Sequence, residues 1–358
     1  MKILVVDTCY PAFLTSHYAQ HPGLDEAPYT RQWRALMGTY FGTADSYSHY
    51  LAVIGHEAHE VVVNAEPLQT AWAAEHSVRR PLLARVRRRA GPELVVAQAE
   101  WYEPDVVYVQ NLGFLSPDTL AALRARSRLL VGQIASEPPG REHLERFDLI
   151  LTSFPHFVQR FRDLGIASEY FRIGFDPRVL QRLGPTERRY GAVFVGALGR
   201  LQHARGNDLL ERAAGRAAIE FWGYAAGERP PDSPIMRNYH GEAWGIDMFR
   251  VLAESRIAVN RHIDVAEGYA NNMRLYEATG VGALLLTDAK RNLGELFADG
   301  EVVAYRDEDE LVDAIDYYLV HEDERRAIAE AGQRRTLTDH TYAVRMQELA
   351  GILGRYLS

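Results

Sequence analysis

Short runs of apolar residues alternate along the chain with segments that carry apolar residues at helical spacing. In the first half, this pattern predicts strands at 3–6, 60–63, 105–109, 128–131, 149–152 and 170–173. It predicts helices between them, at 46–55, 92–101, 117–126, 141–146 and 156–164. Such alternation is typical of βαβ units, in which parallel strands form a sheet with helices on both faces.

The second half repeats the pattern, with strands predicted at 192–195, 219–222, 257–260, 283–287 and 302–305. Helices are predicted at 205–214, 248–255, 272–279 and 308–318, and the last stretch, 321–358, consists almost entirely of helix formers. Pro177, Gly184 and Pro185 indicate a linker at 177–190. We therefore predict an α/β protein of two Rossmann-like, doubly wound domains, 1–176 and 191–338, that face each other across a cleft. The end, 339–358, is predicted to be a helix that is able to cross back to the first domain.

Composition narrows the class of protein. The 358 residues are 47% hydrophobic and 25% charged, which is a globular composition. The net charge of −8 argues against nonspecific nucleic-acid binding. The single cysteine, Cys9, excludes a disulfide framework and is expected to be a packed residue. No apolar run approaches the roughly 18 residues of a membrane span, so a cytoplasmic protein is expected.

The stretch GYANNMRLYEATGVGALLLTD, residues 268–288, contains the most informative helix start. If Asn271 caps this helix, the backbone N–H groups of Asn272 and Met273 are available to an anion, and Arg274 adds a positive charge. Glu277 follows about 7 Å further along the helix axis. The carboxylate of Glu277 suits a ribose diol, so the stretch fits a nucleotide diphosphate. The alternative is an Arg274–Glu277 ion pair on a solvated helix face.

Three further features follow predicted strands of the same domain. FVGALGRLQHARGND, residues 194–208, places Gly196 and Arg205 where a backbone and a guanidinium can approach a phosphate, or where an ordinary loop carries a solvent arginine. FWG at 221–223 and YHG at 239–241 combine aromatic residues with glycines, which suits a flat base or simple core packing. His262, in VNRH, is either a ligand contact or a hydrogen-bonded structural residue. Together with the helix start at 268–288, these features at strand ends of one domain favour a nucleotide site.

These motifs resemble the C-terminal domain of GT-B glycosyltransferases, and most closely the CgeB-like (spore maturation protein) group of family-1-type transferases. The shared pieces begin with FVG…ARG, FWG, YHG, VNRH and NMRLYEATGVGALLLTD, and continue with ELF at 295–297, DEDELVDAIDYYLVHEDERRAIAEAG at 307–332 and DHTYAVR at 339–345. The resemblance covers about 165 residues in the same order. In the first half, only FDLILTS at 147–153, GFDP at 174–177 and the strand–helix layout match.

The resemblance implies a GT-B fold and a nucleotide-sugar donor held mainly by the second domain, without a metal or other cofactor. By position, Glu277 would bind the ribose, and Arg205 and the helix start from Asn271 to Arg274 would hold the diphosphate. Tyr239, His240 and Gly241 would lie near the base. Related retaining enzymes carry a second glutamate, at the position that Tyr269 takes here, with Glu267 the nearest upstream glutamate. The stereochemical outcome is therefore left open.

Catalysis needs an acceptor hydroxyl and, in an inverting enzyme, a general base. The candidates follow strands of the first domain: Glu137, His156 and Asp7. A long segment, 10–44, follows the first strand directly and is expected to be a functional loop that shapes the acceptor pocket. Its aromatic residues suit stacking on a sugar: Tyr10, His17, Tyr29 and Trp33.

We predict a glycosyltransferase that moves a sugar from a nucleotide diphosphate to an acceptor hydroxyl. A nucleotide-sugar epimerase or hydrolase of GT-B shape would act on the donor alone, and a two-lobed sugar-binding protein would carry no activity. The sequence does not identify the sugar, the base or the acceptor.

Overall fold

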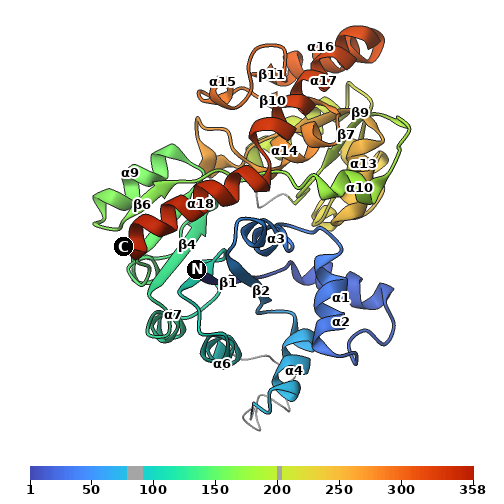
Figure 1. Cartoon of the computed structure of the whole chain (residues 1–358). Helices are drawn as coiled ribbons and strands as arrows, with labels where there is room; N and C mark the ends of the chain where they lie inside the picture. Colours follow the sequence, from blue (N-terminus) through green and yellow to red (C-terminus); the bar gives the residue numbers. More distant parts are fainter. Residues whose placement is uncertain (79–91, 200–203) are drawn as a thin grey trace. The chain divides into compact units, whose positions relative to one another are not determined.

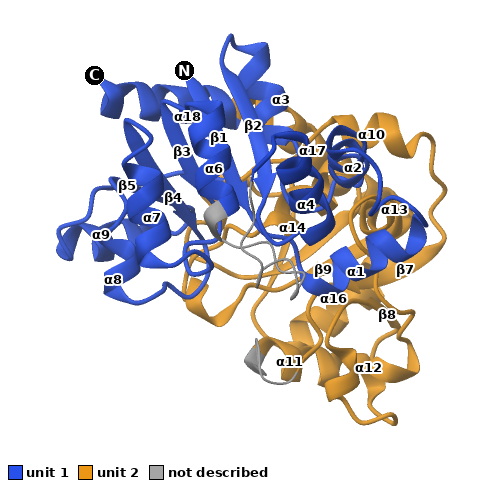
Figure 2. Ribbon diagram, turned by 90° about the horizontal axis from the view of Figure 1, so that it is seen from below, with its two compact units in different colours: residues 1–172, 345–358 blue, residues 173–344 orange. Residues whose placement is uncertain are grey.

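The structure is a computed structural model that describes residues 1–78, 92–199 and 204–358, and the side chains of this set except those of 92, 93, 204 and 205. The chain divides into two compact units (Figure 2). The first unit comprises residues 1–172 together with 345–358, and the second comprises residues 173–344.

The first unit is built on a parallel sheet in the order β2-β1-β3-β4-β5-β6 (Figure 1). Its strands are rich in Val, Ile and Leu and are mostly buried, as expected for a sheet covered on both faces. The strands are β1 (Lys2–Asp7), β2 (Glu57–Val62), β3 (Val106–Val109), β4 (Leu129–Ile134), β5 (Leu149–Thr152) and β6 (Ser168–Tyr170).

The helices of the first unit begin in several cases with a proline in the first turn, where the missing N–H costs nothing. They are α1 (Pro11–Gln20), α2 (Tyr29–Met37), α3 (Ser46–Val53), α4 (Glu66–Glu75), α6 (Pro92–Tyr102), α7 (Pro117–Arg124), α8 (Arg141–Leu144) and α9 (Pro155–Asp163).

The second unit has a parallel sheet in the order β11-β10-β9-β7-β8. Its strands are β7 (Tyr190–Val195), β8 (Ile219–Trp222), β9 (Ser255–Asn260), β10 (Leu284–Asp288) and β11 (Val303–Tyr305). Its helices are α10 (Arg178–Leu183), α11 (Ala204–Ala214), α12 (Pro234–Arg237), α13 (Ile246–Ala253), α14 (Met273–Gly280), α15 (Leu293–Leu296), α16 (Glu308–Val320) and α17 (Glu322–Asp339).

The last helix, α18 (Tyr342–Leu357), brings the end of the chain back to the first unit. Arg345, Met346, Leu349 and Leu353 of this helix are fully buried. Near its end, Arg128 donates to the Leu357 carbonyl at 2.8 Å, and Glu169 lies 3.7 Å from Arg355. Figure 1 shows α18 beside β4 and β6.

Each predicted strand is present, with ends shifted by up to three residues. The expectation that 10–44 is a loop is wrong, because this segment contains α1 and α2. The predicted linker 177–190 contains α10 and lies within the second unit. Among the described residues, no helix combines the length and the apolar character that crossing a membrane requires.

Candidate functional site

Four loops of the second unit meet at one edge of its sheet. They follow β7, β8, β9 and β10, which are neighbours in the order β10-β9-β7-β8. Because all these strands are parallel, their carboxyl ends lie at the same edge, where ligands of open α/β sheets bind. The structure therefore gathers Gly196, His262 and the start of α14, as the sequence predicts.

The start of α14 is held by a network of amides. Asn272 caps the helix, accepting a hydrogen bond from the Leu275 N–H at 3.3 Å. Its side chain also donates to Asn260 Oδ1 at 2.8 Å, and Asn260 donates to Thr287 Oγ1 at 2.9 Å. The helix start is thus fixed to the ends of β9 and β10.

The prediction that Asn271 caps this helix is wrong by one residue. Asn271 is buried, and its Oδ1 accepts a hydrogen bond from the Tyr276 hydroxyl at 2.9 Å. Asn271 therefore orders the chain that enters the helix, and Asn272 shapes the helix start itself.

Arg274 and Glu277 form an ion pair, with Arg274 Nη1 2.9 Å from Glu277 Oε2. The pair is not on a solvated face, because the two side chains are only 14% and 8% exposed. Arg274 Nη2 donates to the Val195 carbonyl at 3.0 Å, at the end of β7. Burial raises the pKa of Glu277, and Arg274 opposes this shift. A buried ion pair gives little net stability, so the Arg274–Glu277 pair is a candidate for ligand binding.

The loop after β7 is packed closely against the end of β8. Gly196 N donates to the Trp222 carbonyl at 3.0 Å. Gly223 has a φ of +155°, and a Cβ there would lie 1.7 Å from the Gly196 carbonyl oxygen. Glycine is therefore required at 223 for the two loops to approach this closely.

Arg261, which the sequence analysis did not single out, lies behind this loop. It is 8% exposed, and its Nη2 donates to the Ala197 carbonyl at 3.1 Å and to Asn207 Oδ1 at 2.5 Å. Burial lowers its pKa to about 10, so it stays charged at neutral pH. Its Nε has no hydrogen-bond partner among the described residues. The sequence signal for Arg261 was its position directly after a buried strand. An arginine at such a position more often points to solvent.

The ARG motif is only partly described. The side chain of the predicted Arg205 lies outside the described residues. Gly206 allows close packing, since a Cβ there would lie 2.4 Å from Cδ of Arg261.

His262 and Asp288 form a hydrogen-bonded pair at the ends of β9 and β10. His262 Nδ1 lies 2.6 Å from Asp288 Oδ1, and the backbone N–H of His262 donates to the same oxygen at 3.0 Å. Burial would raise the pKa of Asp288, but His262 and Lys290 together hold it below its usual value. The ionised carboxylate therefore accepts a hydrogen bond from the Nδ1–H group of His262. His262 Nε2 is left buried, with no hydrogen-bond partner in the part of the chain that the structure describes.

The predicted base-binding segment, Tyr239–Gly241, runs beside the end of β8. His240 N donates to the Phe221 carbonyl and Gly223 N to the Gly241 carbonyl, both at 2.9 Å. The ring of His240 stacks on Trp222 with centroids 4.4 Å apart. The segment therefore forms a short additional edge to the sheet.

In the first unit, the three candidate bases lie at the carboxyl edge but apart from one another. Asp7 ends β1, Glu137 is exposed in the loop after β4, and His156 is the second residue of α9, after β5. β3 and β4 separate β1 from β5. At about 4.8 Å per strand, Asp7 and His156 are about 14 Å apart along the sheet. The three residues do not form one catalytic group.

The carboxyl group of Asp7 is strongly perturbed. Burial raises its pKa to about 7, against a hydrogen bond of 2.7 Å from the Thr8 N–H. Burial, with Asp7 nearby, also raises the pKa of the Cys9 thiol, so Cys9 is no nucleophile at neutral pH.

We expect Asp7→Asn to stabilise the protein increasingly as the pH rises from about 4 to 7, and by a constant amount above pH 7. The unfolded carboxyl ionises near its ordinary value of 3.8 and the folded one at about 7, so wild-type folding loses free energy across this window. Urea unfolding of both proteins at a series of pH values measures the difference. Glu60, with a pKa of about 7, is common to both and cancels. A difference that does not change with pH would contradict the prediction.

The aromatic residues predicted to bind the acceptor take different environments. Tyr10 is 50% exposed just after β1. His17 is buried among Phe13, Tyr18 and His21. Tyr29 and Trp33 of α2 contact His59 of β2: the Tyr29 hydroxyl is 2.8 Å from His59 Nε2, and the Trp33 ring stacks on it with centroids 5.2 Å apart. Of the four, only Tyr10 offers an exposed ring at the carboxyl edge.

Within the described residues, no group of three or more His, Cys, Asp or Glu side chains is arranged to hold a metal ion.

Comparison with known proteins finds a similarity to one family in the second half of the chain. The sequence model of the glycosyl transferase-like family matches residues 202–351, which span most of the second unit. No curated protein matches the sequence significantly.

Solved structures show the fold. HepE of Anabaena, in complex with UDP and glucose, has a TM-score of 0.61 at 15% identity, covering 99% of this chain and 100% of that one. The sucrose-phosphate synthase of Thermosynechococcus elongatus has a TM-score of 0.59 at 12% identity, covering 99% of both chains. AviGT4, a glycosyltransferase involved in avilamycin A biosynthesis, has a TM-score of 0.57 at 14% identity, covering 100% and 98%. The predicted GT-B fold is therefore confirmed.

Proposed function

We propose that this chain, which carries a glycosyltransferase-like domain on a GT-B fold, transfers a sugar from a UDP-sugar to an acceptor hydroxyl. One observation carries the proposal: the buried Arg261, the capped start of α14 and the buried Glu277 of that helix all follow β9, at the carboxyl edge of the second sheet. The choice of uridine is supported by HepE, which has been solved with UDP and with UDP-glucose. The motifs from 194 to 345 support the CgeB-like group.

The diphosphate would be bound by the start of α14 and by Arg261. A helix start offers backbone N–H groups and the positive end of the helix dipole. Arg261 adds a charged guanidinium whose Nε still lacks a partner in the described chain. Together with Arg205, these groups would neutralise charge on the leaving diphosphate, so we propose a reaction that needs no metal.

Glu277 would hold the ribose, and His262 would hold the sugar. The Glu277 carboxylate is fixed beside Arg274 and can accept hydrogen bonds from both hydroxyls of a ribose diol. With its Nδ1 proton directed at Asp288, His262 presents Nε2 as an acceptor for a sugar hydroxyl. A buried nitrogen without a partner costs free energy in the ligand-free protein, and such a hydroxyl would recover it. The base would lie by Tyr239–Gly241.

Asp7 is the candidate we favour for the acceptor's general base. A base works best when its pKa is near the working pH, and Asp7 has a pKa of about 7. Glu137 and His156 remain alternatives at the same edge of the first sheet, with Tyr10 as a contact for the acceptor. Tyr269 stands where retaining relatives carry a glutamate, so the product's anomeric configuration must be measured.

The direct test is a thermal-shift screen of UDP, GDP and dTDP, followed by product analysis of the best UDP-sugar with and without an added sugar acceptor. UDP at one hundred times its Kd should stabilise the protein by about 2.7 kcal/mol. Release of UDP that depends on the acceptor supports transfer. Turnover of the donor without an acceptor would favour a hydrolase or epimerase. If no nucleotide stabilises the protein, a sugar-binding protein without activity would be favoured.

We expect Arg261→Lys to weaken UDP binding at least about tenfold, because an ammonium group replaces the planar fork of donors. Isothermal titration of wild type and variant measures the change. Arg306→Lys, at an arginine that is 80% exposed and paired with Glu310, is the matched control and should bind UDP like the wild type. If all three proteins bind UDP with equal affinity, Arg261 does not contact UDP.

A further inference from the structure

A second cluster of positive charge lies at the opposite edge of the second sheet. A pocket of about 420 Å³ is lined by four arginines and two glutamates, together with Gly282, Ala329 and Gln333: Arg188, Arg256, Arg325, Arg326, Glu322 and Glu330. Arg188 precedes β7, Arg256 is the second residue of β9, and Gly282 precedes β10. These are the amino ends of the strands, whereas the proposed donor site is at their carboxyl ends.

Two arginines of this arginine pocket are held in place by hydrogen bonds to the backbone. Arg188 Nη1 donates to the carbonyls of Ala253 and Ser255, at 2.6 and 2.8 Å, and its Nη2 donates to the Gly282 carbonyl. Arg325 is only 6% exposed, and its Nη1 donates to the Tyr318 carbonyl at 3.0 Å. Two of the four guanidinium groups are therefore fixed by the backbone, before any ligand is present.

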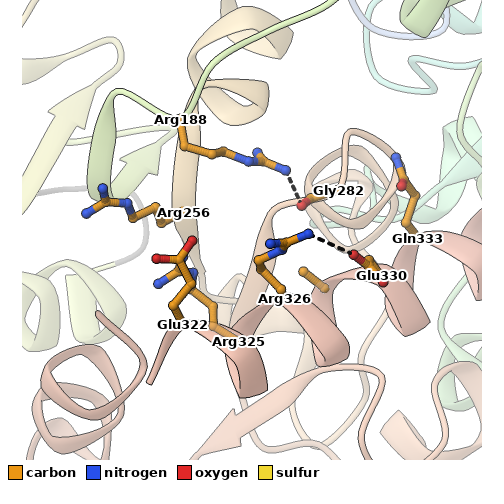
Figure 3. Close-up of a pocket in the computed structure, with 9 residues that line it drawn as sticks. Arg188, Arg256, Gly282, Glu322, Arg325, Arg326, Glu330 and Gln333 are labelled. Carbon is orange, nitrogen blue, oxygen red and sulfur yellow. Dashed lines mark hydrogen bonds and ion pairs between the residues drawn. The ribbon is translucent and has the colours of Figure 1, made fainter. Parts of the chain in front are cut away.

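The remaining two arginines extend from this frame. Arg326 is 65% exposed and lies 3.9 Å from Glu330, and Arg256 is exposed with no ion-pair partner among the described residues. Figure 3 shows Arg188 bonded to Gly282 and Arg326 paired with Glu330. The exposed side chains of Arg256 and Arg326 can move onto a ligand without disturbing the fold.

The charges in the pocket are unbalanced. Four guanidinium groups face two carboxylates, which leaves two positive charges uncompensated. Burial lowers the pKa of Arg188, and Arg325 lowers it further. Burial also lowers the pKa of Arg325, Glu322 opposes this, and Arg256 and Arg326 add to the lowering. The arginines repel one another in a partly enclosed space, and a dianion would turn this repulsion into attraction.

We propose that this arginine pocket binds a small molecule with two adjacent phosphate charges, at a site separate from the nucleotide-sugar site. Guanidinium forks match phosphate oxygens in pairs. The volume suits a small ligand, because small-molecule pockets measure about 300 to 1,000 Å³. The protein's net charge of −8 makes a nucleic acid an unsuitable ligand.

The test is isothermal titration with inorganic pyrophosphate, in the presence of excess UDP to fill a diphosphate site at the other edge of the sheet. The double variant Arg256→Ser/Arg326→Ser removes the two exposed arginines and should bind pyrophosphate at least about tenfold more weakly than the wild type. Arg212→Ser/Arg306→Ser is the control. It also removes two exposed arginines of the second unit, so the change in net charge is the same. It should bind like the wild type.

Circular dichroism and thermal unfolding should show that both double variants keep the fold, because all four arginines are exposed. Inorganic phosphate should bind the wild type at least about tenfold more weakly than pyrophosphate, since it carries fewer charges. Equal pyrophosphate affinity in the pocket variant and the control, or no binding to the wild type at millimolar concentration, would overturn the proposal. Because the pocket variants leave Arg261 and Glu277 untouched, this result is separate from the fate of the proposed transferase activity.

Discussion

Replacing Glu277 with glutamine is expected to weaken UDP binding at least about tenfold while the protein stays folded. The carboxylate would accept hydrogen bonds from two ribose hydroxyls, and an amide offers only one oxygen. Glutamine is the better test because alanine would leave Arg274 buried without its partner, a change that costs about 3–5 kcal/mol. Isothermal titration with UDP measures the loss, with Glu295→Gln, at an exposed position of α15, as the control.

A second ligand separates a ribose contact from a general loss of structure. Deoxy-UDP lacks the 2′-hydroxyl, so the wild type should bind it more weakly than UDP. Glu277→Gln should bind the two ligands almost equally, because the group that distinguishes them is gone. If the variant keeps the full preference for UDP, Glu277 does not contact the ribose.

Replacing Gly223 with alanine is expected to destabilise the protein by at least about 3 kcal/mol or to prevent folding of the second unit. The new methyl group would lie 1.7 Å from the Gly196 carbonyl oxygen, which belongs to the backbone and cannot rotate away. The ends of β7 and β8 would have to separate, and the loop that approaches Arg261 would move with them.

Urea unfolding, monitored by circular dichroism, measures this cost. Gly227→Ala is the matched control, because a Cβ there meets no atom within 4 Å and the residue lies in a short 3-10 helix nearby. The control should unfold at nearly the wild-type urea concentration. If Gly223→Ala is as stable as the wild type, the loops at Gly196 and Gly223 are not in such close contact.

Much of the fold could be predicted because its strands are buried on both faces and read as short runs of Val, Ile and Leu. The helices α1 and α2 were missed: α1 carries no clear apolar periodicity, and the amphipathic pattern of α2 lies in a segment whose Tyr, His and Pro content favoured a loop. Their stability depends on packing against the rest of the unit, as Tyr29 shows by its contact with His59. Such contacts between distant residues are not visible in a local pattern.

The candidate site was predictable to the level of loops but not of side-chain contacts. The helix start before Glu277 was found, although Asn272 caps it and not Asn271. Arg261 was missed, because its burial depends on Asn207, which is 54 residues away in the sequence. The pair of His262 with Asp288 was equally hidden, since it joins two strands that only the sheet order makes adjacent.

The return of α18 to the first unit has a consequence for synthesis on the ribosome. The strands β1 to β6 emerge early, yet the buried Arg345, Met346, Leu349 and Leu353 that complete their unit are translated only after the whole second unit. The second unit, continuous from 173 to 344, can finish folding first, while the older half of the chain waits with an uncovered apolar surface. A truncation that removes α18 would therefore damage the half of the protein that was made first.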